Sequence, residues 1–131
     1  MSGYTVVNLK EVEDQAPKFG YAPHLESRFA RKALGLRQSG LSHFKIAPGF
    51  RVPFGHRHED QEEVYVVVAG SARIKLGDDI VDLGPWDAVR VTPEMTRGIE
   101  AGPEGAEILA FGAPSNENAD AQMVRGFWPS D

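Results

Sequence analysis

Two histidines and a carboxylate lie close together in the segment GHRHEDQEEVYVVVAG. His56 and His58 are one residue apart, so on a β-strand both imidazoles leave from the same face. The polar EDQ that follows suits a reversal of the chain, which would bring Glu63 on the next strand opposite the two rings. Two histidines and one carboxylate bind Fe(II) with open coordination positions, and they also suit Zn, Mn or Ni. We therefore predict a divalent metal site.

The histidine pair alone would not decide this, because two histidines on a strand are more often simply hydrogen-bonded. Glu63 at the right distance, the apolar strand that follows it and Gly70 at the end of that strand favour the metal. Tyr65 shares the strand face of Glu63. It therefore either lines the pocket as a hydroxyl donor that binds a ligand or packs in the core.

The elements that must position these residues are short strands. Fourteen glycines and nine prolines in 131 residues favour many turns and an all-β architecture. The apolar and β-branched runs predict strands over residues 41–46, 52–58, 62–69, 72–76, 80–83, 88–91, 96–101 and 106–111. This spacing is typical of a sandwich, jelly roll or barrel. Phe44, Val67 and Phe111 are expected to fill its interior.

A chain of 131 residues fits one domain with one core. We expect the barrel core over about 40–112, an N-terminal arm over 1–39 and a C-terminal tail over 113–131. In the arm, residues 4–9 suit a short edge strand, and residues 25–36 fit a short helix or a strand. The aromatic pair Phe127–Trp128 in the tail either docks on its own barrel or forms a dimer contact.

Composition excludes several functions. The formal charge is −5 and no basic run appears, which argues against a nucleic-acid partner. The chain has no cysteine, so disulfides and thiolate metal sites are excluded. The start of the sequence does not resemble a signal peptide, and no apolar run approaches the length of a membrane span. We expect a cytoplasmic protein without a membrane partner.

The order Gly49, His56-x-His58, Glu63, Gly70 resembles the first conserved motif of the cupin superfamily, which runs G, HxH, E, G. The gap before His56 is one residue longer than usual. The resemblance implies an all-β, single-domain cupin, a double-stranded β-helix or jelly-roll barrel, with a short N-terminal arm or helix. It also implies that the two histidines and the glutamate are metal ligands.

The segment LGPWDAVRVTPEMTRGIEAG resembles the second cupin motif, with Trp86-Asp87 in place of Gly-Asp and Pro93 at the motif's proline. The histidine that normally completes the metal site in this family aligns with Arg97. A guanidinium cannot ligate a cation, and it stays protonated at any working pH.

Two outcomes are open. In one, a site of His56, His58 and Glu63 persists, and Arg97 points aside to clamp an anionic ligand. In the other, Arg97 pairs with Glu63 and the barrel holds no tight metal. We favour the metal, because all three remaining positions keep ligand chemistry.

The resemblance implies a protein that binds a small molecule. It is either a metal-dependent enzyme of the dioxygenase or isomerase type, or a metal-free binding or sensing protein in which Arg97 anchors an anionic ligand. A structural dimer is a third alternative. Cupins span many reactions, so the fold chooses neither substrate nor catalytic residues. By analogy with cupin barrels that pair through sheet edges, we expect a homodimer.

Overall fold

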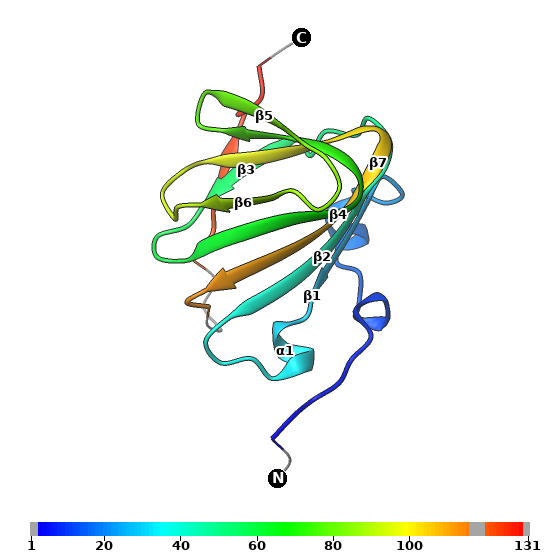
Figure 1. Ribbon diagram of the computed structural model, residues 1–131, viewed down its shortest axis with the longest axis vertical. Helices are drawn as coiled ribbons and strands as arrows, with labels where there is room; N and C mark the ends of the chain where they lie inside the picture. Colours follow the sequence, from blue (N-terminus) through cyan, green and yellow to red (C-terminus); the bar gives the residue numbers. More distant parts are fainter. Residues whose placement is uncertain (1–2, 116–119, 130–131) are drawn as a thin grey trace.

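The computed structural model describes residues 3–115 and 120–129, and their strands form one curled sheet (Figure 1). The strands are β1 (Leu25–Phe29), β2 (Gly40–Ile46), β3 (Phe54–Arg57), β4 (Glu62–Leu76), β5 (Asp79–Leu83), β6 (Ala88–Val91), β7 (Arg97–Ala113) and β8 (Gln122–Arg125). The short helices are η1 (Leu9–Glu11), η2 (Ala16–Phe19) and α1 (Arg31–Leu34). None of the helices in the described ranges has the length and apolar character that a membrane span needs.

The long strands β4 and β7 pair antiparallel along nearly their whole length and give the sheet its curl. Each was predicted as two strands, and that prediction was wrong. Gly70 does not end a strand, because two register shifts beside it bend the ladder without breaking it. Its φ is +72°, and a Cβ there would lie 2.0 Å from the carbonyl oxygen of Gly105. A residue with a side chain is therefore excluded twice, by backbone conformation and by contact.

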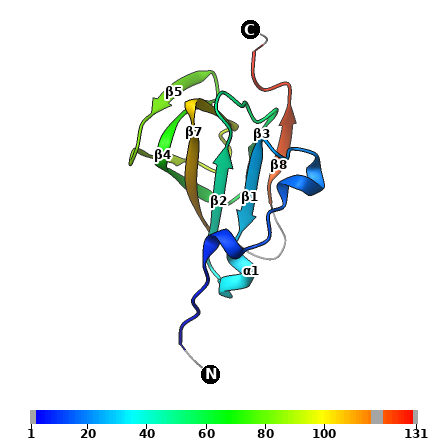
Figure 2. The same cartoon turned by 90° about the vertical axis from the view of Figure 1, so that its right-hand side faces the viewer.

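The sheet extends beyond the core expected over 40–112. The segment 25–36 forms a strand and then a helical turn, β1 and α1, so both expected conformations occur in succession. Residues 4–9 form no strand, and the edge-strand prediction was wrong. At the other end, β8 pairs with β3, as Figure 2 shows.

The sheet encloses a core in which Val67, Ile74 and Ile108 are at most 1% exposed. Phe111 was expected inside but is 44% exposed, because strand alternation points its neighbour Ala110 inward instead.

The tail docks on its own barrel. Phe127 packs against Lys75, whose Nζ lies 3.7 Å from the ring centroid. A Cβ at Gly55 would lie 2.6 Å from this ring, so glycine provides the room. Trp128 stacks under Arg51, with 4.4 Å between the guanidinium carbon and the ring centroid. Of the two expected placements of these aromatics, docking within the chain is the one observed.

Candidate metal centre

Three side chains predicted from the sequence converge inside the barrel. His56 lies on β3, His58 directly after it, and Glu63 near the start of β4. Their nearest ligand atoms all lie within 4.8 Å of one another. The route differs from the expected strand pair, because β3 pairs with β7 and β8 and shares no ladder with β4. The imidazoles and the carboxylate therefore meet across the barrel.

Glu63 is at the middle of the cluster. Its Oε1 lies 3.2 Å from His58 Nε2 and 3.4 Å from His56 Nε2. The hydroxyl of Tyr65 donates a hydrogen bond of 2.5 Å to the same oxygen. Tyr65 is 2% exposed, so it packs in the core, and it also lines the pocket. Its expected role as a ligand-binding hydroxyl stays a prediction.

The electrostatics of the cluster favour an ionised Glu63. Burial alone would raise the pKa of this carboxyl, but the neighbouring His56 and His58 imidazoles and the Tyr65 hydrogen bond outweigh burial and hold the pKa well below its usual range. Burial and the neighbouring Glu63 charge raise the pKa of the Tyr65 hydroxyl well above its ordinary value. Tyr65 is therefore a neutral donor and Glu63 an anionic acceptor.

Asp120 is a residue that sequence reasoning missed. Its Oδ1 lies 2.6 Å from His58 Nδ1, and its Oδ2 accepts hydrogen bonds from the backbone N–H of Asp60 (2.9 Å) and Gln61 (3.2 Å). Burial would raise the pKa of Asp120, but the bond from Asp60, the bond from His58 and the bond from Gln61 lower it to about 2. No spacing signal links it to the motif, because it lies in the tail far along the chain.

The pairing with Asp120 determines which nitrogen of His58 faces the cluster. Nδ1 donates to the carboxylate, so Nε2 is the ring atom directed at the centre. In the described part of the chain, this buried Nε2 has no hydrogen-bond partner of acceptable geometry. Burial lowers the pKa of His58, but the Glu63 and Asp120 carboxylates beside the ring raise it more. In the protonated ring Nε2 also carries a hydrogen, which a metal would have to displace in order to bind.

Arg97 is fully buried at 0% exposed and lies opposite His56 in the β3–β7 ladder. Its Nε is 3.7 Å from Glu63 Oε1. The terminal nitrogens donate to the main-chain oxygens of Thr92 (3.2 Å), Pro93 (3.3 Å) and His56 (3.5 Å). Arg97 therefore points toward Glu63 instead of aside, and only its Nε lacks a hydrogen bond within the described residues.

This donor set fits a divalent metal. Two imidazole nitrogens and one carboxylate oxygen are the ligands that Fe(II), Zn and related ions take. The buried Nε2 of His58 makes no hydrogen bond within the described residues, so it is available as a coordinating atom. The positive charge of Arg97 opposes the cation, but the guanidinium is held back by three carbonyl oxygens.

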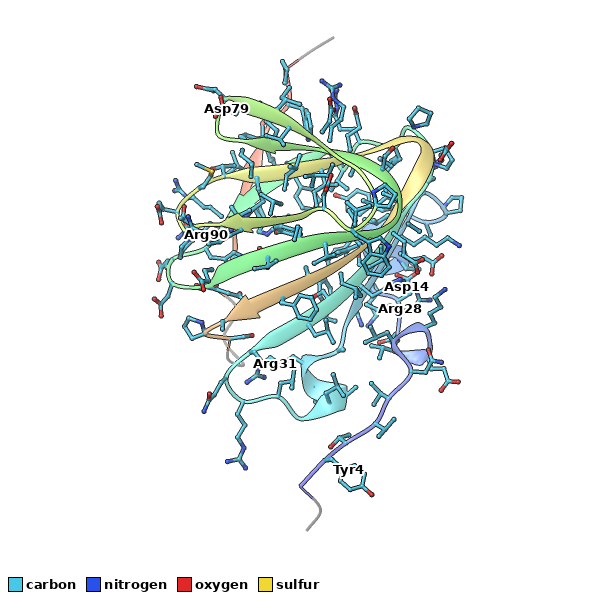
Figure 3. The ribbon with its side chains drawn as sticks, in the orientation of Figure 1. Tyr4, Asp14, Arg28, Arg31, Asp79 and Arg90 are labelled. Atoms are coloured by element: carbon cyan, nitrogen blue, oxygen red, sulfur yellow. The ribbon has the colours of Figure 1, made fainter. Side chains whose placement is uncertain are left out.

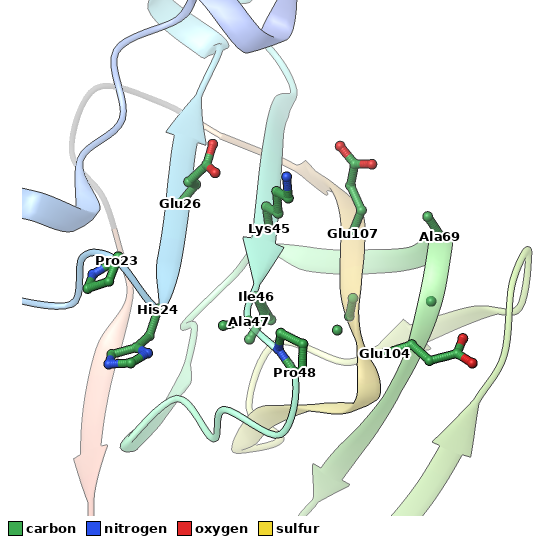
Figure 4. Close-up of a pocket in the computed structure, with 13 residues that line it drawn as sticks. Pro23, His24, Glu26, Lys45, Ile46, Ala47, Pro48, Ala69, Glu104 and Glu107 are labelled. Carbon is green, nitrogen blue, oxygen red and sulfur yellow. The ribbon is translucent and has the colours of Figure 1, made fainter.

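The cluster lines a pocket of ≈ 820 Å³ that also reaches β1, β2 and η2. This volume is within the range of small-molecule sites. A second pocket, of ≈ 400 Å³, lies on the outside of the sheet (Figure 4). There Glu26, Lys45 and Glu107 follow one another across β1, β2 and β7, so the charges alternate across neighbouring strands. We assign that second pocket no function.

No model of a known protein family matches the sequence, and neither does any curated protein. Solved structures do match. A cupin protein from Bacteroides fragilis aligns over 90% of this chain and 90% of its own, with a TM-score of 0.72 and 20% identity. The chain has the cupin fold.

Two other matching structures are enzymes by name. The polyketide cyclase RemF from Streptomyces resistomycificus has a TM-score of 0.72 at 20% identity, over 97% of this chain and 88% of its own. A nucleoside dehydratase from Streptomyces has a TM-score of 0.69 at 18% identity, over 95% and 92%. At such identities the likeness establishes the cupin fold and leaves the reaction of this chain open.

Proposed function

We propose that this cupin barrel binds one divalent metal ion through His56, His58 and Glu63 and acts on a small molecule held in the adjoining pocket. The observation that carries the proposal is the convergence of the three donors within 4.8 Å at a pocket of ≈ 820 Å³. An ion held by three protein ligands keeps open positions for a substrate.

When bound, the metal supplies Lewis acidity or a site for dioxygen, the needs of isomerase-type and dioxygenase-type reactions respectively. The chain's own residues have separate tasks. Asp120 fixes the ring of His58, and the Tyr65 hydroxyl holds the Glu63 carboxylate by a hydrogen bond of 2.5 Å. The same hydroxyl lies 3.5 Å from His56 Nε2, so it contacts two of the three donors.

Metal analysis of the protein purified without a histidine tag tests the proposal. We expect about one equivalent of a transition metal after metal-replete growth, and its loss in His56→Ala and His58→Ala. His24→Ala is the matched control, because His24 is exposed and lies outside the cluster. A protein that takes up no metal, or that keeps the same content in all four forms, would refute the metal site.

A metal-free binding protein is the second candidate, and the position of Arg97 favours it. With its Nε 3.7 Å from Glu63 Oε1, the guanidinium already neutralises the carboxylate that a metal would need. In this alternative Arg97 and the two imidazoles bind an anionic ligand directly. This alternative predicts that an anion raises the melting temperature of the metal-free wild-type protein but not that of the metal-free Arg97→Met variant.

We also propose a homodimer. In the described part of the chain, β5 pairs only with β4, so one side of β5 is a sheet edge without a strand partner. Pairing of two such edges would hide their main-chain groups from other chains. Light scattering at micromolar concentration tests this, and a monomer mass would contradict it.

A further inference from the structure

Five aromatic rings line the large pocket. Phe19, Phe29, Phe44, Phe54 and Tyr21 all line it, which is four of the chain's seven phenylalanines. Phe29 meets Phe44 edge to face, with 6.1 Å between ring centroids, and Tyr21 meets Phe54 at 5.8 Å. Phe19 is 66% and Phe29 50% exposed. Rings left open along a cavity offer edges and faces to another ring.

Arg31 adds one cation to this wall. Arg31 is the first residue of α1, soon after the end of β1, and Figure 3 shows it below the sheet. It lines the same pocket as Phe29. Its Nε is buried without a hydrogen-bond partner, and within residues 3–115 and 120–129 its guanidinium has no ion pair. Burying an N–H donor of a guanidinium without a hydrogen bond lowers the stability of the fold, and an acceptor that binds there removes this free-energy cost.

We propose that the ligand of this pocket is a flat aromatic molecule with one acidic group, a carboxylate or phenolate, that binds Arg31. The aromatic body packs against the wall of Phe29 and Phe44, and the opposite end faces the His56–His58–Glu63 centre. The placement of that reacting end rests on the proposed function, whereas recognition by the wall and Arg31 does not.

Calorimetric titration with two matched probes tests the charge. The probes are 2-naphthoate and the neutral 2-naphthalenemethanol, each titrated into protein stripped with EDTA and into zinc-loaded protein. We expect naphthoate to bind about tenfold tighter than the alcohol in both forms of the wild type. Arg31→Gln should abolish the preference, and Arg31→Lys, which keeps the charge but not the planar fork, should retain part of it. Arg37→Gln is the control, since Arg37 is exposed and outside the pocket.

A second pair of variants tests the aromatic wall. Phe29→Ala should weaken binding of both probes several-fold. Phe111→Ala should change neither, because Phe111 has a similar exposure but does not line the pocket. All variants alter partly or fully exposed side chains, and unchanged melting temperatures verify that they fold.

The outcomes separate this inference from the proposed function. Equal affinity for both probes, or a preference that persists in Arg31→Gln, overturns the inference. A preference lost in His56→Ala or in stripped protein but kept in Arg31→Gln also overturns it, because the acid then binds the metal, and the metal site stands. An Arg31-dependent preference in a protein that takes up no metal supports the inference and removes the proposed metal function.

Discussion

The Asp120 contact predicts that metal affinity depends on a residue that touches no metal. Asp120→Asn replaces a carboxylate that accepts from His58 Nδ1 at 2.6 Å and from two backbone N–H groups at 2.9 and 3.2 Å. The asparagine side chain has one oxygen and no charge, so it cannot accept hydrogen bonds from both the His58 ring and the backbone N–H groups of Asp60 and Gln61 as well as the carboxylate does. Partners of this kind typically change metal affinity by about 10–100-fold, or about 1.4–2.7 kcal/mol.

The assay is competition for zinc with a chromophoric chelator at pH 7. We expect Asp120→Asn to raise the zinc dissociation constant within that range and Asp120→Ala to raise it at least as far. Asp78→Asn is the control, because Asp78 is exposed and outside the pocket. If Asp120→Asn binds zinc as tightly as the control, then the His58–Asp120 pair does not orient a ligand and the reasoning is refuted.

Three further predictions concern charge and packing. Arg97→Met should tighten zinc binding about tenfold or more, since it removes a cation 3.7 Å from Glu63. It should also lower the melting temperature, since three main-chain carbonyl oxygens lose their hydrogen-bond donor. Unchanged zinc affinity would contradict the view that Arg97 competes with the metal for Glu63. Gly70→Ala should destabilise the fold by several kcal/mol more than Gly49→Ala, because both glycines have positive φ but only at Gly70 would the new Cβ lie 2.0 Å from a backbone atom. Equal losses of unfolding free energy in chemical denaturation would contradict this prediction. The hydrogen bond from His43 lowers the pKa of Glu107, so the ionised carboxylate stabilises the fold above its ordinary pKa of 4.5 and this stabilisation is lost as the pH falls further. The melting-temperature difference between wild type and Glu107→Gln should therefore shrink below about pH 5. A difference that stays constant with pH would contradict this prediction.

The candidate centre was predictable because its chemistry is local. The order His-x-His followed by Glu within one segment specifies the ligand types, and strand alternation places His56, Glu63 and Tyr65 on inner faces. The way they meet was not predictable. The sequence suggests a strand that folds back on its neighbour, whereas β3 and β4 reach the centre from separate ladders.

Residues distant along the chain escaped the sequence analysis for a physical reason. Asp120 reaches His58 because β8 pairs with β3, and a four-residue strand in a polar tail has no periodicity to reveal it. Gly70 shows the opposite error, since a glycine at a bulge and a glycine at a turn look alike in sequence. The strands themselves were largely predictable, because apolar alternation bounded by Gly and Pro is a strong local signal.

The central claim is that His56, His58 and Glu63 share one metal ion beside Arg97. The most direct test is an anomalous difference map from crystals of the zinc-loaded protein. The account predicts a single peak about 2.0–2.2 Å from both imidazole Nε2 atoms and from a Glu63 oxygen. A map without a peak there, with Arg97 still against Glu63, would contradict it.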